Sequence, residues 1–127
     1  MSVIRTAILS LVLAFGAGAV LSQDFQKGLA AYEAGDYATA LEEWRPLAEQ
    51  GSVDAQHILG AMYDKGTGVL QDYVMAHMWL NIAAANGHEK AGEFRQKIAG
   101  QMTSADISEA QKMARECMNN KYKNCGF

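Results

Sequence analysis

Two glycines one residue apart, Gly66 and Gly68, are the first feature of this sequence that could do chemistry. Glycine-rich loops bind phosphates when their amides converge on the anion, which requires a preceding strand, a following helix and further Gly or Lys-Ser/Thr residues at set spacing. Here a helical stretch carrying Leu59 and Tyr63 precedes the glycines, and a loop ending at Asp72 follows them. We therefore predict a turn between two antiparallel helices.

Side chains suited to metal binding or hydrolysis are few and scattered. His57, His77 and His88 fall in three different predicted helices, and none pairs with another His or a Glu at i, i+4. Lys112 follows Ser108 by four residues rather than three, so the Ser-x-x-Lys pattern of penicillin-recognising enzymes is missing, as is Gly-x-Ser-x-Gly. We predict no catalytic residue, no metal site and no cofactor, and we keep a hydrolase as the weaker alternative.

The two cysteines, Cys117 and Cys125, lie close together near the end of the chain. In an exported chain a disulfide is the default interpretation of such a pair. A metal-binding pair is the alternative, although no His lies near these cysteines in the sequence. Their spacing does not match the Cys-x-x-Cys of a redox site.

The N-terminal segment has the layout of a secretory signal peptide. Arg5 is followed by an apolar run from Ala7 to Phe15 and then by small residues. We predict residues 1–22 as the signal, with cleavage before Gln23; a cut after Ala19 and a retained anchor are the alternatives. The cleaved chain would be periplasmic or secreted, without stable membrane insertion.

The charge balance argues against a nucleic-acid partner. The chain of 127 residues has 11 Lys and Arg against 14 Asp and Glu, a net charge of −3. We find no basic stripe with interleaved aromatics, and an acidic surface disfavours polyphosphates. A chain of this length can build one domain with one hydrophobic core.

The elements that must position these residues are all helical. Good helix formers dominate beyond the signal, no strand-length alternation occurs, and Gly-Asp, Gly-Ser and Gly-His pairs separate the periodic stretches. Thr103 and Asp106 have the spacing of a capping box. We predict an all-α fold with helices at about 24–34, 37–50, 53–65, 73–86, 88–100 and 104–118.

These helices repeat a common pattern. The stretches 29–55 and 59–91 share an aromatic, a Gly turn, Asp-Tyr, a Trp and a closing Ala in the same order. The offset is 36 from Asp36 to Asp72 and from Gly51 to Gly87. Two helix pairs of one design predict a short α/α solenoid.

The second copy resembles one full Sel-one-like repeat, a relative of the tetratricopeptide repeat. The first copy is similar to the shorter tetratricopeptide version, and the tail from Ala99 resembles the closing helices that often follow such repeats in exported bacterial proteins. The resemblance implies a short repeat at about 25–54, a full repeat at about 55–91 and a C-terminal cap at about 92–127, together a repeat domain over 23–127. The matched residues run as Ala55-x3-Leu59-Gly60-x2-Tyr63-x2-Gly66-x-Gly68-Val69-x2-Asp72-x3-Ala76-x2-Trp79-x3-Ala83-Ala84-x2-Gly87-x3-Ala91.

The resemblance implies a superhelix of antiparallel helix pairs that binds another protein or peptide as an adaptor or regulator, without common catalytic residues. An envelope structural protein held by its N-terminus is the alternative. In related repeats the first helices of each pair form the binding side, and by that analogy the candidate contact residues are Gln26, Glu33, Gln56, His57 and Asp64. The residues expected to shape the repeat itself are Gly60, Tyr63, Gly66, Gly68, Asp72, Trp79 and Gly87.

Overall fold

A computed structural model describes residues 24–126, and the predicted signal peptide lies outside this range. The described part contains six helices, and each predicted helix is present with bounds within one residue of the prediction. The all-α fold is therefore confirmed. The helices are α2 (Phe25–Glu33), α3 (Tyr37–Glu49), α4 (Val53–Lys65), α5 (Tyr73–Ala85), α6 (Glu89–Ala99) and α7 (Ser104–Asn119).

Local sequence signals explain where these helices begin and end. Each described helix begins after an N-cap residue whose side chain accepts a hydrogen bond from a backbone amide of the first turn. The amides of the first turn have no carbonyl partner within the helix, so this bond satisfies one of them. Glycines with positive φ then let the chain reverse between helices, as at Gly66, where φ is 68°. The N-cap residues are Asp24, Asp36, Ser52, Asp72, His88 and Thr103.

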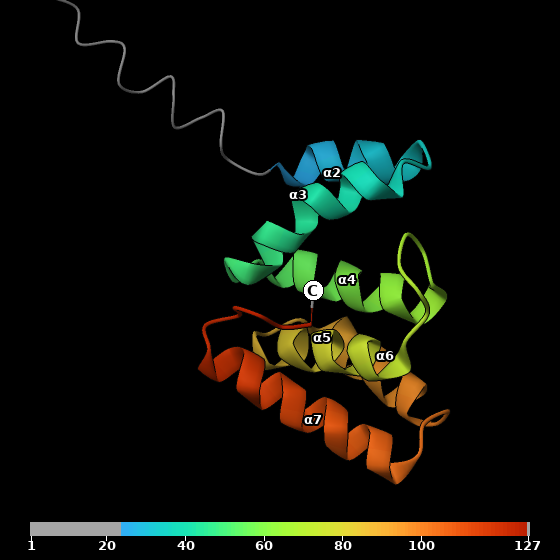
Figure 1. Ribbon diagram of the computed structural model, residues 1–127, viewed down its shortest axis with the longest axis vertical. Helices are drawn as coiled ribbons and strands as arrows, with labels where there is room; N and C mark the ends of the chain where they lie inside the picture. The colour runs from blue at the N-terminus through green and yellow to red at the C-terminus, as the bar shows by residue number, and fades with distance from the viewer. Residues whose placement is uncertain (1–23, 127) are drawn as a thin grey trace, which may run out of the picture.

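The helices are layered from α2 at one end of the molecule to α7 at the other, with α5 and α6 together between α4 and α7 (Figure 1). Helix α2 packs on α3, α3 on α4, and α4 on α5. Both α6 and α7 pack on α5, so α5 is the central helix, and its residues from Met75 to Leu80 are all buried. The chain beyond α7 then runs back over α5 toward α4 (Figure 1).

Each of the first two helix pairs has one glycine at its closest approach. A Cβ atom added to Gly28 would lie 2.5 Å from the Trp44 indole nitrogen, and one added to Gly60 would lie 2.6 Å from Leu80 Cγ. Trp44 and Leu80 both follow the N-cap aspartate of their helix by eight residues, so they occupy equivalent positions. The expectation that Trp44 matches Trp79 is off by one residue, and both tryptophans are nevertheless buried.

Candidate protein-binding face

The first helices of the three pairs are α2, α4 and α6. We call the surface formed by their exposed sides, where α2 adjoins α4 and His57 of α4 contacts His88 at the start of α6, the first-helix face. Between α2 and α4 this face contains a pocket of about 210 Å³, here called the α2–α4 pocket. Its walls are mostly apolar, with one imidazole. It is smaller than the usual 300–1,000 Å³ of small-molecule sites and suits a side chain of a bound polypeptide. The lining residues are Leu29, Tyr32, Trp44, His57, Ile58, Ala61 and Met62.

Two histidines join α4 to α6 beside this pocket. The rings of His57 and His88 stack with centroids 4.2 Å apart and planes 10° from parallel. His88 is the N-cap of α6, and its Nδ1 accepts a hydrogen bond from the Ala91 amide at 3.2 Å. Nδ1 can accept only when it carries no proton, so this contact requires a neutral His88 ring protonated at Nε2. Nε2 lies 3.7 Å from an Asp54 carboxylate oxygen.

The surroundings of His57 favour its neutral form. Burial lowers the pKa of His57, and the neighbouring His88 lowers it further, while Asp54 acts in the opposite direction. The Nδ1 atom of His57 is buried without a hydrogen-bond partner. A charge on this ring would therefore be poorly compensated.

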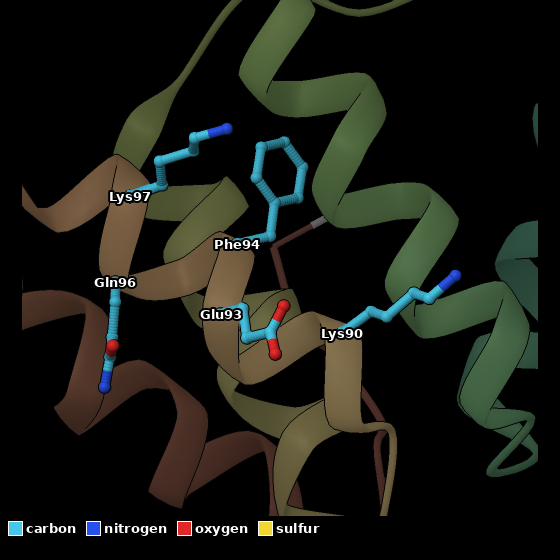
Figure 2. Close-up of a pocket in the computed structure, with 5 residues that line it drawn as sticks. All are labelled: Lys90, Glu93, Phe94, Gln96 and Lys97. Atoms are coloured by element: carbon cyan, nitrogen blue, oxygen red, sulfur yellow. The ribbon is translucent and has the colours of Figure 1, made fainter.

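Beyond the histidines, the exposed side of α6 forms a second depression of about 580 Å³, here called the α6 hollow. The Phe94 ring projects from α6 toward α4, with Lys90 and Lys97 to either side (Figure 2). Phe94 lies 6.4 Å from the His57 ring, measured between centroids. His57 lines the α2–α4 pocket and Phe94 the α6 hollow, so the two depressions adjoin.

Four of the five predicted contact residues lie where a partner could reach them. Gln26 and Glu33 are exposed, and helical spacing places them beside Leu29 of the α2–α4 pocket. Asp64 is half-buried three residues after Ala61, and His57 lines the pocket directly. Their contact role stays a prediction.

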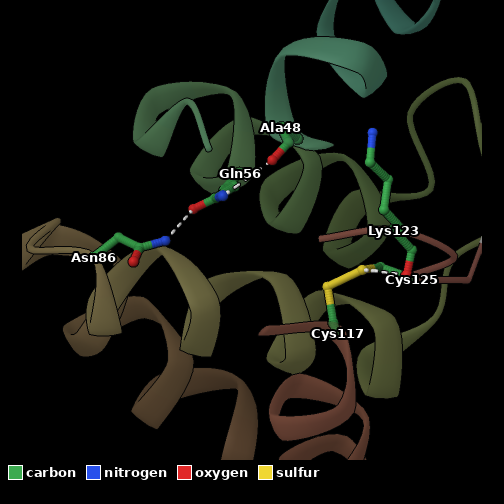
Figure 3. Close-up of a disulfide and its surroundings, with 6 residues drawn as sticks. All are labelled: Ala48, Gln56, Asn86, Cys117, Lys123 and Cys125. Carbon is green, nitrogen blue, oxygen red and sulfur yellow. Dashed lines mark hydrogen bonds between the residues drawn. A yellow bond between two sulfur atoms is a disulfide. The ribbon is translucent and has the colours of Figure 1, made fainter. Parts of the chain in front are cut away.

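Gln56 requires a correction, because it is fully buried and unavailable to a partner. Its Nε2 donates to the Ala48 carbonyl at 3.1 Å, and its Oε1 accepts from Asn86 Nδ2 at 3.0 Å (Figure 3). Asn86 Oδ1 in turn accepts from the Tyr122 hydroxyl at 3.2 Å. Gln56 is thus one link in a chain of hydrogen bonds from the end of α3 to the C-terminal tail.

The sequence prediction also missed the apolar residues of the face. Leu29, Ile58 and Phe94 have the residue types and spacing of a buried stripe, and the aromatic residue Tyr32 would be expected in the core for the same reason. All four are only half-buried. Sequence gives no signal that separates a groove lining from a core, because both present apolar residues at helical spacing. The stacking of His57 on His88 was missed because the two residues come from different helices.

A disulfide joins Cys117 in α7 to Cys125 in the tail, and both cysteines are buried (Figure 3). The tail between them turns through positive φ at Lys121, Tyr122 and Asn124, which side-chain-bearing residues rarely adopt. The disulfide therefore stabilises a turn whose backbone conformation is strained. It keeps Tyr122 within hydrogen-bond distance of Asn86.

The Gly66–Asp72 loop uses its amides to close a helix end. The Gly66 and Thr67 amides both donate to the Met62 carbonyl, and the Asp72 amide donates to the Tyr63 carbonyl at 2.9 Å. Gly68 has a φ of 74°, and a Cβ there would lie 2.7 Å from Tyr37 Cβ. These contacts are those of a helix-to-helix turn.

Within residues 24–126, no group of three or more His, Cys, Asp or Glu side chains is placed to hold a metal ion. None of the helices in this range is both long and apolar enough to cross a membrane.

Comparison with known proteins identifies the central helix pair. No curated protein matches the chain. Residues 53–88, which cover α4, the Gly66–Asp72 loop and α5, match the family model of the Sel1 repeat, the Sel-one-like family named above. Sel1 repeats are generally protein-interaction modules, and their fold is not a catalytic one. Residues 53–88 are therefore a Sel1 repeat, the repeat that this stretch of the sequence resembles.

Proposed function

We propose that this chain is an exported protein-interaction module, acting as an adaptor or regulator without catalytic activity of its own. It binds a segment of another protein on the first-helix face. The observation that carries this proposal is the α2–α4 pocket, an apolar depression continued across His57 to the α6 hollow. A bound segment would place a large apolar side chain in the pocket, where burying it supplies about 1.5–3 kcal/mol.

Two observations support export. The first residues have the layout of a signal peptide, with cleavage proposed before Gln23. The disulfide between Cys117 and Cys125 would persist in an oxidising compartment such as a periplasm or the extracellular space. N-terminal sequencing of the protein from its source cells tests this part: a mature chain that starts at Gln23 is expected, and one that retains Met1 contradicts it.

The binding proposal is tested by placing a charge in the pocket. Ala61 is half-exposed and lines the α2–α4 pocket, whereas Ala105 is exposed at the start of α7, outside the first-helix face. The mature chain and its Ala61→Glu and Ala105→Glu variants are cross-linked in the compartment where the protein resides, and the partners are identified by mass spectrometry.

The expected result is a partner that cross-links to the parent and to Ala105→Glu but not to Ala61→Glu. A desolvated carboxylate in an apolar pocket is costly, so binding should fall at least tenfold. Circular dichroism confirms that each variant is folded. A partner retained equally by both variants would show that binding uses another face, and no specific partner for the folded parent would contradict the function itself.

A further inference from the structure

The stacked histidines give the binding face a means of responding to acid. We propose that His57 and His88 form a pH-sensitive latch, which holds α6 against α4 while both rings are neutral and releases the first turn of α6 when they are protonated. The inference rests on the proposed function, because the latch lies between the α2–α4 pocket and the α6 hollow. It would therefore regulate the binding of a partner on that face.

The first step concerns the cap of α6. The Ala91 amide donates both to His88 Nδ1 and to the His88 carbonyl, each at 3.2 Å. The first of these bonds exists only while Nδ1 is unprotonated, so protonation leaves the amide with the carbonyl alone. Protonation at Nδ1 removes the acceptor and adds a positive charge next to the positive end of the helix dipole. The five other N-caps use Asp, Ser or Thr oxygens, which do not lose their acceptor near neutral pH. Among the described helices, α6 is thus the one whose start depends on a neutral imidazole.

The second step concerns the stack. Two neutral imidazoles 4.2 Å apart attract each other as aromatic rings, but two imidazolium ions at this distance repel each other. The backbones of α4 and α6 both pack on α5 and make few contacts with each other. The side-chain contacts of His57 with His88 and Phe94 therefore make up much of the link between α4 and α6.

Other charged groups near the pair do not cancel this effect. Asp54 attracts a proton to the pair, but its side chain is 75% exposed and its pull is screened by water. Lys90, in the first turn of α6, opposes a charge on His57. Glu89 lies beside His88 and favours the helix start in either state. Across the α2–α4 pocket the side chain that faces His57 with a titratable group is that of Tyr32.

Two substitutions separate the parts of the latch. His88→Asn keeps a side-chain oxygen that can accept from the Ala91 amide but removes the titratable ring, and Asn is among the best N-caps. His57→Phe keeps an aromatic ring for stacking but removes its charge. His77, the third histidine, is present in both variants and controls for acid effects elsewhere.

The test is nuclear magnetic resonance on the free mature chain between pH 7.5 and pH 5. The protonation of each imidazole is followed by its ring shifts, and the hydrogen-exchange protection of the Ala91 amide is corrected for the intrinsic exchange rate. In the parent we expect Ala91 protection to fall about fivefold or more as His88 protonates, since loss of an N-cap changes a helix-start equilibrium by about that factor. In His88→Asn and in His57→Phe the fall should be markedly smaller than in the parent, because only the general loss of stability from the remaining histidines is left.

Unchanged Ala91 protection while the His88 ring is shown to be protonated would overturn the latch. An equal acid loss in His88→Asn would overturn it as well, because the effect would then arise elsewhere. These measurements need no partner, so they remain decisive if the proposed function fails. If the Ala61→Glu experiment does identify a partner, its affinity should weaken from pH 7.5 to pH 5 for the parent and remain nearly constant for His88→Asn.

Discussion

The close approach of α4 to α5 can be tested by adding a single methyl group at Gly60. The Cβ of Gly60→Ala would lie 2.6 Å from Leu80 Cγ and 3.3 Å from the Ala76 carbonyl oxygen. Leu80 and Ala76 are fully buried in the central helix, so neither side of the contact has free space to move into. The helices must therefore separate or Leu80 must leave its preferred rotamer.

The magnitude follows from two opposing terms. Overpacking of a tight core costs about 1–3 kcal/mol, whereas replacing a mid-helix glycine by alanine gains roughly 0.5–1 kcal/mol in helix stability. Subtracting the gain from the cost gives a destabilisation of about 0–2.5 kcal/mol, centred near 1 kcal/mol. At roughly 4–8 °C per kcal/mol for a domain of this size, the central value lowers Tm by about 4–8 °C.

Gly92 provides the matched control for this measurement. It lies inside α6, and a Cβ there would meet Ala84 Cβ at 3.8 Å, an ordinary contact. Gly92→Ala should therefore gain helix stability without any cost from overpacking, and its Tm should rise by about 3–6 °C. Thermal unfolding followed by circular dichroism compares the two variants with the parent. If Gly60→Ala were as stable as Gly92→Ala, the close packing of α4 on α5 would be refuted.

Three further predictions concern the tail and the buried histidines. Cys117→Ser should destabilise the oxidised protein by roughly 2–3 kcal/mol for a loop of this length, and an unchanged melting temperature without reductant would contradict a stabilising role of the disulfide. Tyr122→Phe should cost about 0.5–1.5 kcal/mol in chemical unfolding through the lost hydrogen bond to Asn86, and a variant as stable as the parent would show that this bond does not stabilise the tail. Burial lowers the pKa values of His57 and His77, so the folded state resists their protonation. Stability should thus be full above about pH 6.5 and fall as the pH drops below it, as checked by urea midpoints at pH 7.5 and 5.5; an unchanged midpoint would argue against buried neutral rings.

The helices were predictable because the signals that define them are local. Each N-cap and each glycine after a helix acts within one turn, so the sequence alone contains what is needed to place Asp36, Ser52 or Gly66. The repeat offset of 36 then pairs the helices, since both copies must bury the same stripe. These features need no knowledge of what lies across the fold.

The candidate binding face was less predictable because its properties arise between helices. Gln56 is polar and was expected to contact a partner, but neighbours 8 and 30 residues away satisfy its amide inside the protein. His88 was expected within a helix and is instead its N-cap, a role usually taken by Ser, Thr, Asp or Asn. Its stacking on His57 depends on how α4 and α6 meet, which no spacing along one helix encodes.

The C-terminal tail explains how so short a stack can be stable. A helical repeat cannot bury its faces alone, and a solenoid needs a terminal element in place of the next repeat. Here α7 packs on α5, and the tail returns over α5, where Gly126 lies against Met75 and Tyr122 reaches Asn86. The disulfide holds that tail in place. The tail and α7 cover α5 and contribute no residue to the α2–α4 pocket, where we propose that a partner binds.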